Sequence, residues 1–573
     1  MKLNILHKAV MGLGLVALMG FTAVSCTESD SELVSFQDDN NLDSPNDTIY
    51  SIIGIIGNLQ KVADRTILLG EVRGDLTVVT EAANTDLQDL ANFKAKPGST
   101  YNDARDYYAI IQNCNYYLAN VNADLVLRGR KVFEKEIAVV RTYRAWAYLQ
   151  LAINYGSVPF TDQPVLTEAD ANPASLPKYD LQQICDYFIN DLQAYTDTEL
   201  PSYGNVGGVN SKYFYIPVRL LLGDLCLWGG HYSEAARYYH AYLTKENNTV
   251  PTFTDGVRWY DQEFENVRGS ISASPICFIP MAAQESDGQV SYLGDVFCST
   301  VNNNDFYQVT RSTAYDQLSR SQKYTLVYIN TTTNRPDTVS PPEDKVYENE
   351  QMRGDLRQWM YYTTSTNRTA TSNQSSLRQT VMRWTPTVSS GGVSGTVRMN
   401  GSLSGYVSRV PLYRDMFIYL RYAEAMNRAG FPQTAFAVLK YGLWRDNIEK
   451  YIDENERNRA GDLLNFSQYE FLRTNTQGIH ARGSGDADAN KEYAIPDLTT
   501  RDDSILWVEN AICDEMALET ATEGQRYFDL MRLSMHRGDP SFLADKVARR
   551  SGTRDEQLYQ LLCNQQNWYL KIE

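Results

Sequence analysis

The spacing of apolar residues changes along this chain. From about residue 48 to about residue 245, apolar side chains recur at three- and four-residue intervals, most clearly in 101–122 and 133–155. This spacing places them on one face of an α-helix. The sequence YGSVP ends the second of these helices with its Gly and Pro. A further helix is expected to begin near Lys178, so the first half of the chain is predicted to be helical.

Two segments repeat the small-residue spacing of a helical hairpin. LLLGDLCLWGGHYSEAARYYHAYL contains Gly223, Gly230 and Ala235, and YLRYAEAMNRAGFPQTAFAVLKYGL has Gly430 and Ala435 at matching places. Small residues let two helices pack closely, and Gly supplies the turn. The spacing fits the tetratricopeptide (TPR) pattern and predicts a TPR-like scaffold.

The middle of the chain, about 250–410, is poor in helical periodicity and rich in Thr, Ser, Asn and Gly. Two short apolar runs, 276–279 and 324–328, are typical of strands. The segment 363–376 is almost entirely small and polar, which predicts a loop. Because binding residues are often carried on loops, this insert is the expected ligand-binding part.

The helical pattern returns after the insert, and 502–536 is predicted to hold a long helix that is interrupted near Gly524. The predicted fold is mainly α: a TPR-like helical scaffold with a large insert of irregular loops and short strands. The predicted parts are a lipoprotein signal peptide (1–25), an acidic tether (26–48), an N-terminal helical part with TPR-like hairpins (49–249), the insert (250–410) and a C-terminal helical part that completes the scaffold (411–573).

The first residues have the pattern of an export signal. Lys2 and Lys8 precede an uncharged apolar run at 9–24, which is shorter than the roughly 20 residues that span a bilayer. The sequence AVSC at its end resembles a bacterial lipobox, which implies cleavage before Cys26 and lipidation of its sulfur. The acidic residues that follow resemble the surface-export signal of Bacteroidetes lipoproteins. The alternative is an ordinary secretory signal with a cysteine at this place by chance.

The composition of the chain limits the classes of partner that it can bind. The net charge of -17 argues against nucleic acid, whose phosphates need a basic surface. It also argues against charge-driven docking on an anionic bilayer. Apart from Cys26, seven cysteines are scattered without a CxxC pair, and we expect buried free thiols rather than a disulfide framework.

Four groups of residues together resemble the SusD/RagB family of Bacteroidetes outer-membrane lipoproteins. They are YYAII at 107–111 and RTYRAWAYL at 141–149 with the following YGSVP, MRGDLR at 352–357 with its Asp-x-Arg, VPLYR at 410–414 running into YAEAMN at 422–427, and Glu515 and Glu519 followed by EGQRYFDLMR at 523–532. The residue types look structural. We expect Arg414 and Glu424 to tie a strand end to a helix, and Arg526, Asp529 and Arg532 to pair along one helical face.

The resemblance implies a function. Proteins of this family lie on the cell surface as lids over a SusC-like TonB-dependent transporter, and they bind nutrient oligomers. An oligosaccharide is the expected ligand and an oligopeptide the alternative. The expected location is the outer membrane, facing the cell surface, with a lipid anchor.

Catalytic signatures are missing from the sequence: there is no GxSxG, P-loop, GxGxxG or HExxH. We therefore expect no enzyme, no cofactor and no catalytic or metal-binding residue. Two other functions remain possible alternatives: a surface glycoside hydrolase with paired carboxylates, and a TPR adaptor for protein partners. Two other sites are alternatives as well: a calcium site of loop Asp residues, and a phosphate site at His480 and Arg482 in a Gly-rich loop.

A glycan binder needs aromatic planes for the apolar faces of sugar rings and planar polar groups for the hydroxyls. The insert supplies Tyr292, Trp359, Trp384 and Tyr406, and Tyr361, Tyr362, Arg378 and Arg383 lie nearby in the sequence. Loops in the early half supply Arg73, Asp75 and Asn84. The predicted ligand-binding residues are Arg73, Asp75, Asn84, Tyr292, Trp359, Trp384 and Tyr406.

Overall fold

The computed structural model describes most residues between 47 and 572. The longest gaps between them are 246–274, 340–353, 395–405 and 467–477. The signal peptide, Cys26 and nearly all of the predicted tether lie outside the described residues.

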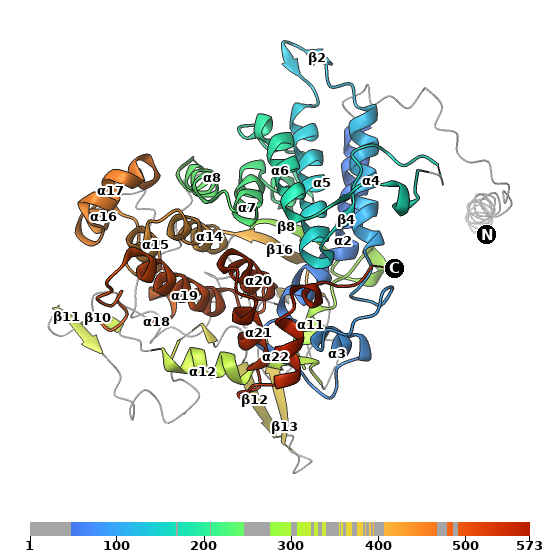
Figure 1. Ribbon diagram of the computed structural model, residues 1–573. Coiled ribbons are helices and arrows are strands. Elements are labelled where there is room, and N and C mark those ends of the chain that lie inside the picture. Colours follow the sequence, from blue (N-terminus) through green and yellow to red (C-terminus); the bar gives the residue numbers. More distant parts are fainter. Residues whose placement is uncertain are drawn as a thin grey trace, which may run out of the picture.

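The N-terminal half is a row of helices that stand side by side (Figure 1). Apolar faces at the predicted spacing pack α2 against α4, α4 against α5, α5 against α6 and α6 against α7. The Asp180 carboxylate caps the first turn of α6, which places its start three residues after Lys178. The bounds are α2 (Asp47–Glu71), α3 (Thr85–Ala91), α4 (Arg105–Asn120), α5 (Glu134–Tyr155), α6 (Leu181–Leu192), α7 (Val218–Trp228) and α8 (Tyr232–Lys245).

The two predicted TPR-like hairpins are confirmed. The first is α7 with α8, and the second is α14 (Asp415–Arg428) with α15 (Pro432–Lys440); α14 also packs on α8, so the hairpins stack. At Gly223 a Cβ atom would lie 2.4 Å from the ring of Tyr239, so only glycine permits this close approach. Gly430 supplies the turn of the second hairpin with φ +88°.

The C-terminal helices complete the scaffold beside the first row (Figure 1). The long helical stretch predicted at 502–536 consists of α19 and α20, interrupted at 521–525, where Gly524 has φ +76°. The bounds are α16 (Arg445–Tyr451), α17 (Glu454–Ala460), α18 (Ala481–Ser484), α19 (Arg501–Thr520), α20 (Arg526–Arg537), α21 (Pro540–Ala548) and α22 (Glu556–Leu562).

Short antiparallel strand pairs are set into this scaffold. The strand predicted at 276–279 is β8 (Pro275–Pro280), which pairs with β16 (Arg409–Arg414) in the middle of the molecule (Figure 1). The other pairs are β1 (Thr77–Val79) with β9 (Val309–Arg311), β2 (Val126–Leu127) with β3 (Arg130–Lys131), β4 (Val158–Pro159) with β5 (Lys178–Tyr179), β6 (Asn205–Val206) with β7 (Val209–Asn210), β10 (Leu326–Asn330) with β11 (Arg335–Val339), and β14 (Ser389–Ser390) with β15 (Val393–Ser394). Two short helices, α11 (Leu293–Phe297) and α12 (Thr313–Ser321), lie between β8 and β10 in the sequence.

The prediction of a loop at 363–376 is wrong. This segment contributes β12 (Thr363–Arg368) and the start of β13 (Ser375–Thr380), which pair as an antiparallel ribbon. Threonine is β-branched and favours extended backbone, and here that preference outweighs the small polar composition on which the loop was predicted.

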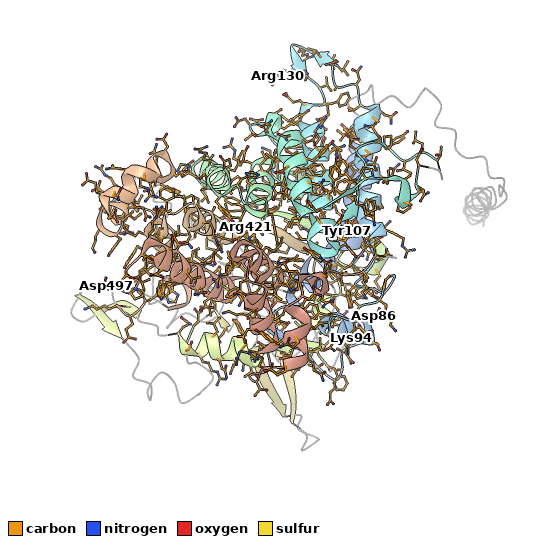
Figure 2. The ribbon with its side chains drawn as sticks, in the orientation of Figure 1. Asp86, Lys94, Tyr107, Arg130, Arg421 and Asp497 are labelled. Atoms are coloured by element: carbon orange, nitrogen blue, oxygen red, sulfur yellow. The ribbon has the colours of Figure 1, made fainter. Side chains whose placement is uncertain are left out.

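Side chains from both halves share one apolar core, and Tyr107 lies inside it, whereas Arg130 lies far out on the β2–β3 hairpin (Figure 2). The seven described cysteines are free thiols, as predicted; six are buried and Cys563 is half-buried.

Candidate functional site

Two tyrosine rings meet at the surface beside the β8–β16 pair. Tyr292 is 46% exposed, and its ring lies 5.5 Å from the half-buried Tyr406 ring in an edge-to-face arrangement. The Glu285 carboxylate joins them, because it accepts a hydrogen bond from the hydroxyl of Tyr406 at 2.6 Å and from that of Tyr292 at 3.3 Å. We call Glu285, Tyr292 and Tyr406 the tyrosine platform.

Strand pairing brings the platform together from distant parts of the sequence. β8 leads into the segment that carries Glu285 and Tyr292, and Tyr406 stands just before β16. The amide of Met281 donates to the Ser408 carbonyl at 2.9 Å, which continues the β8–β16 pairing towards the platform. An exposed aromatic pair is therefore attached to the rigid centre of the fold.

The carboxylate makes both phenols weaker acids than an ordinary tyrosine. The hydrogen bond to Glu285 raises the pKa of Tyr406 to about 12. Partial desolvation and the neighbouring Glu285 also raise the pKa of Tyr292. At neutral pH the platform therefore offers two aromatic faces, two hydroxyl groups and a carboxylate with acceptor capacity.

Asn84 is an exposed residue that precedes α3. Its side chain caps α3 by accepting from the Leu87 amide at 2.8 Å, and it donates to Gln308 at 3.2 Å. Tyr101 connects Asn84 to the platform, because its hydroxyl contacts Asn84 and it lies close enough to Asp64 to feel its charge. Burial, and then the charge of Asp64, raise the pKa of Tyr101. Asp64 in turn accepts a hydrogen bond from the Tyr292 amide. The structure thus brings together Tyr292 and Tyr406, with Asn84 nearby.

Arg73 and Asp75 lie in the core, not in loops that face a ligand. Arg73 has no exposed surface; it donates to the Asn154 side chain at 2.5 Å and lies 4.3 Å from the centre of the Tyr527 ring. Asp75 forms a two-point ion pair with Arg526 at 2.5 and 2.9 Å. Their burial argues against direct ligand contact, so we leave both out of the proposed site.

Trp384 is also removed from the site by burial. Its indole N–H donates to the Thr522 carbonyl at 3.0 Å, its ring stacks on Phe297, and none of its surface is exposed. Trp359 lies outside the described residues, as do Tyr361, Tyr362 and Arg383, and so does the side chain of Arg378.

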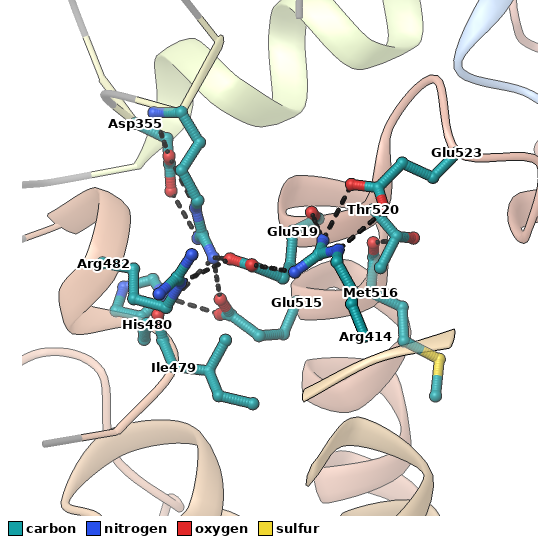
Figure 3. Close-up of polar contacts among 11 residues, drawn as sticks. Asp355, Arg414, Ile479, His480, Arg482, Glu515, Met516, Glu519, Thr520 and Glu523 are labelled. Carbon is teal, nitrogen blue, oxygen red and sulfur yellow. Dashed lines mark hydrogen bonds and ion pairs between the residues drawn. The ribbon is translucent and has the colours of Figure 1, made fainter. Parts of the chain in front are cut away.

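Three of the four groups that carried the family resemblance meet with the Gly-rich loop in a buried ionic network (Figure 3). Arg357 donates to Asp355, Glu515 and Glu519 at 2.6–2.9 Å, and Arg414 binds Glu519 and Glu523. Although burial alone would raise it, the pKa of Glu519 is lowered to about 2 by its three arginine neighbours. The network consists of Asp355, Arg357, Arg414, His480, Arg482, Glu515, Glu519 and Glu523.

This network corrects the interpretation of the Gly-rich loop. His480 and Arg482 are 4% and 3% exposed, and they pair with Glu515 at 2.8 Å and Glu519 at 3.2 Å. Carboxylates already bind both side chains in the core, which argues against the alternative of a phosphate site at these two residues.

Two predicted ion pairs have different partners. Arg414 binds Glu519 and Glu523, whereas Glu424 binds Arg532 at 2.6 Å. Arg532 does pair with Asp529 as predicted, at 2.8 Å. Arg526 on the same helix instead binds Asp75 of the N-terminal half. The actual partners come from other elements because the tertiary packing, and not the helical spacing, sets which charges become buried together.

Sequence reasoning missed Glu285 and Asp64. Both are acidic residues in a chain with 70 of them, and no local pattern distinguishes either. Only the pairing of β8 with β16, and the contacts of α2 with β8 and with the segment before α11, give them a place in the site.

Cavities occur elsewhere in the described part of the chain. A groove of about 920 Å³ runs between α15–α17 and the segment before α19, with Tyr441 and Tyr451 in its wall. A small polar cavity of about 60 Å³ lies at the centre of the fold beside Asp224 and Arg421, where Figure 2 labels Arg421. Neither of these two cavities includes a platform residue.

Within the described ranges, no three His, Cys, Asp or Glu side chains are grouped so that they could hold a metal ion. Among the same residues, no helix combines the length and the apolar character needed to cross a membrane.

The sequence model of the SusD family matches residues 235–561 of this chain. The chain belongs to the SusD family. The match spans the second TPR-like hairpin, both platform tyrosines and the whole ionic network. No curated protein sequence matches the chain significantly.

Solved structures with the SusD fold resemble this SusD-family chain at low sequence identity. A SusD superfamily protein from Bacteroides thetaiotaomicron is 16% identical with a TM-score of 0.51, over 91% of this chain and 97% of that one. One from Bacteroides fragilis is 17% identical with a TM-score of 0.52, over 85% and 87%. A second from Bacteroides fragilis, described as a SusD-like carbohydrate-binding protein, is 14% identical with a TM-score of 0.50, over 87% and 88%. These similarities confirm the helical fold.

Proposed function

We propose that this SusD-family chain is a cell-surface lipoprotein that binds oligosaccharides and passes them to a SusC-like TonB-dependent transporter. The observation that carries the proposal is the exposed tyrosine platform. Membership of the family and the fold shared with a protein described as carbohydrate-binding support it.

The platform has the chemistry that an oligosaccharide requires. The Tyr292 and Tyr406 rings offer planes for the C–H faces of sugar rings, and Glu285 offers an acceptor for sugar hydroxyls. An open platform can contact part of a long chain, whereas a closed pocket would select a monosaccharide. We propose Tyr292, Tyr406 and Asn84 as ligand-binding residues.

Calorimetry with oligosaccharide and oligopeptide libraries tests the ligand class. Each aromatic contact contributes roughly 0.5–1.5 kcal/mol beyond its area, so the double variant Tyr292→Ala/Tyr406→Ala should weaken binding by about tenfold or more. Leu506→Ala is the matched control, because Leu506 is 49% exposed on α19. Binding of peptides alone would overturn the choice of glycan, and full affinity in the folded double variant would overturn the site.

The alternative function, a surface glycoside hydrolase, predicts a different result. A binding protein returns oligosaccharides intact after long incubation with the pure protein, whereas a hydrolase shortens them. Chromatography of the sugars decides the matter, and shortened products would reject the binding-only role.

Membrane attachment is proposed to occur through Cys26. Labelled fatty acid should enter the wild-type protein and not Cys26→Ala. Equal labelling of the two proteins would reject the lipid anchor and leave an ordinary secretory signal.

The transporter partnership is tested by extraction of native membranes with a gentle detergent. A permanent lid needs a large interface, on the order of 2,000 Å² or more. A large β-barrel should therefore be recovered with this protein. Recovery as a monomer from cells that express the barrel, or with soluble partners only, would contradict the proposal and favour an adaptor.

A further inference from the structure

Two side chains on one face of α2 contact both ends of the loop that carries the platform. The Gln60 amide donates to the carbonyl of Pro280, the last residue of β8, at 2.6 Å. One helical turn later, Asp64 accepts from the Ser291 hydroxyl at 2.6 Å and from the Tyr292 amide at 2.7 Å. Residues four apart on a helix point to the same side, so a single stretch of α2 fixes the start and the end of 281–291.

The loop between these contacts closes on itself through a backbone hydrogen bond and a glycine turn. The Ala282 amide donates to the Gln289 carbonyl at 2.8 Å, and Gly288 takes φ +142°, which favours glycine. Glu285 lies within this loop and meets the tyrosine hydroxyls. The orientation of Glu285 and Tyr292 therefore depends on where the ends of the loop are held.

We propose that Gln60 and Asp64 are positioning residues, which orient Tyr292 and Glu285 for ligand binding by clamping the ends of their loop to the scaffold helix. This inference rests on the proposed function. Neither residue touches the ligand; Asp64 acts through the Tyr292 backbone and through Ser291, which is 1% exposed and directs its hydroxyl inward.

The charge of Asp64 gives the clamp a measurable signature. Burial raises the pKa of Asp64 to about 6; the hydrogen bonds from Ser291 and Tyr292 oppose this shift, and Asp295 of α11 adds to it. The titratable groups that face Asp64 are Asp295 of α11, Tyr292 just before α11, and Tyr101 in the segment before α4. On α2 itself, Arg65 forms an ion pair with Asp106, and Lys61 is exposed.

The ionised carboxylate accepts both hydrogen bonds, and protonation weakens one of them. Ligand affinity should thus fall as the pH drops below about 6, by roughly threefold to tenfold for one hydrogen bond. Stability should change in the opposite direction. Because the folded-state pKa lies above the ordinary value of 3.8, the Asp64 contribution to the free energy of unfolding falls as the pH rises from about 4 to about 6. A role in stability alone would not produce this opposite trend in affinity.

The test uses the soluble chain without its signal, with cello-, xylo-, manno- and maltohexaose as calorimetric probes from pH 5 to pH 8. Asp64→Asn, Ser291→Ala and Gln60→Ala should each weaken binding several-fold, and Asp64→Asn should lose the affinity change near pH 6. Lys61→Ala, at an exposed position of the same helix, is the control and should bind as the wild type. Hydrogen exchange at the Tyr292 amide should be faster in Asp64→Asn and unchanged in Lys61→Ala.

The outcomes separate this inference from the proposed function. If wild type binds a probe, and Asp64→Asn and Ser291→Ala bind it equally well at every pH, the clamp is rejected and the proposed function stands. If wild type binds no oligosaccharide and no peptide, both fail. Should Asp64→Asn unfold, Ser291→Ala decides, since it removes one hydrogen bond to Asp64 and leaves the charge.

Discussion

The buried ionic network and the tyrosine platform are built on opposite principles. The network joins residues from three of the segments that resembled the SusD family with His480 and Arg482, and its charges are hidden from water (Figure 3). The platform joins Glu285, Tyr292 and Tyr406, which come from segments that carried none of that resemblance, and its rings face solvent. In this chain the family motifs therefore mark the scaffold, and the candidate ligand residues lie in the loops that the scaffold holds.

The physical difference between the two regions lies in the consequence of losing one member. A buried charge without a partner is strongly destabilising, because no water replaces the lost contact. A ring lost from an exposed platform leaves water in its place and disturbs little else. Mutations in the network should thus change stability, and mutations in the platform should change affinity.

The largest effect is expected at Arg357. Arg357→Met would leave Asp355, Glu515 and Glu519 without this guanidinium, and the free energy of unfolding should fall by about 3–5 kcal/mol. Arg357→Lys retains the charge but not the planar fork, and should lie between wild type and Arg357→Met. Urea denaturation measures all three; a loss below about 1 kcal/mol in Arg357→Met would break the contrast between the two regions.

A buried carboxyl of α2 should make stability depend on pH. Burial raises the pKa of Glu71 to about 7, against hydrogen bonds from the Thr522 and Gly524 backbone and with the charges of Asp75 and Glu523. Since this is a raised acid pKa, the stabilising contribution is present at low pH and lost as the pH rises from about 4.5 through 7. Glu71→Gln should remove this loss, on the order of 3 kcal/mol at pH 8. Unfolding curves at pH 5 and pH 8 that shift equally in both proteins would contradict the prediction.

A smaller effect, on ligand affinity, is expected at Tyr406 of the platform. Tyr406→Phe keeps the ring and removes the hydrogen bond to Glu285. Affinity should weaken by roughly twofold to fivefold, with the free energy of unfolding unchanged within about 0.5 kcal/mol. Calorimetry and denaturation of the same preparation measure both quantities. A stability loss with unchanged affinity would assign the hydroxyl to the scaffold.

The smallest effect is expected at an exposed ion pair. Arg445 and Glu449 lie one turn apart on α16 at 3.0 Å, with side chains 64% and 60% exposed. Arg445→Ala should change the free energy of unfolding by less than about 0.5 kcal/mol. This variant calibrates the Arg357 result, because it removes the same type of side chain from water and not from the core.

The sequence alone determined the local elements. The TPR-like hairpins, the strand at 276–279 and the interruption near Gly524 follow from the spacing of apolar, small and turn residues, which acts between neighbours in the chain. The sequence also predicts Tyr292 and Tyr406 as candidate ligand residues, because their residue type suits a glycan.

Only the tertiary structure decided which polar residues are buried and with which partners. Arg73, Asp75 and Trp384 share the residue types of a binding site, yet packing places them in the core. Arg526 pairs with Asp75 across 451 positions of the sequence, and Ser291 with Asp64 across 227. Such contacts depend on the packing of whole helices and strands. No local pattern specifies them, because a charge or a ring of the same type serves equally well at the surface and in the core until the fold sets its surroundings.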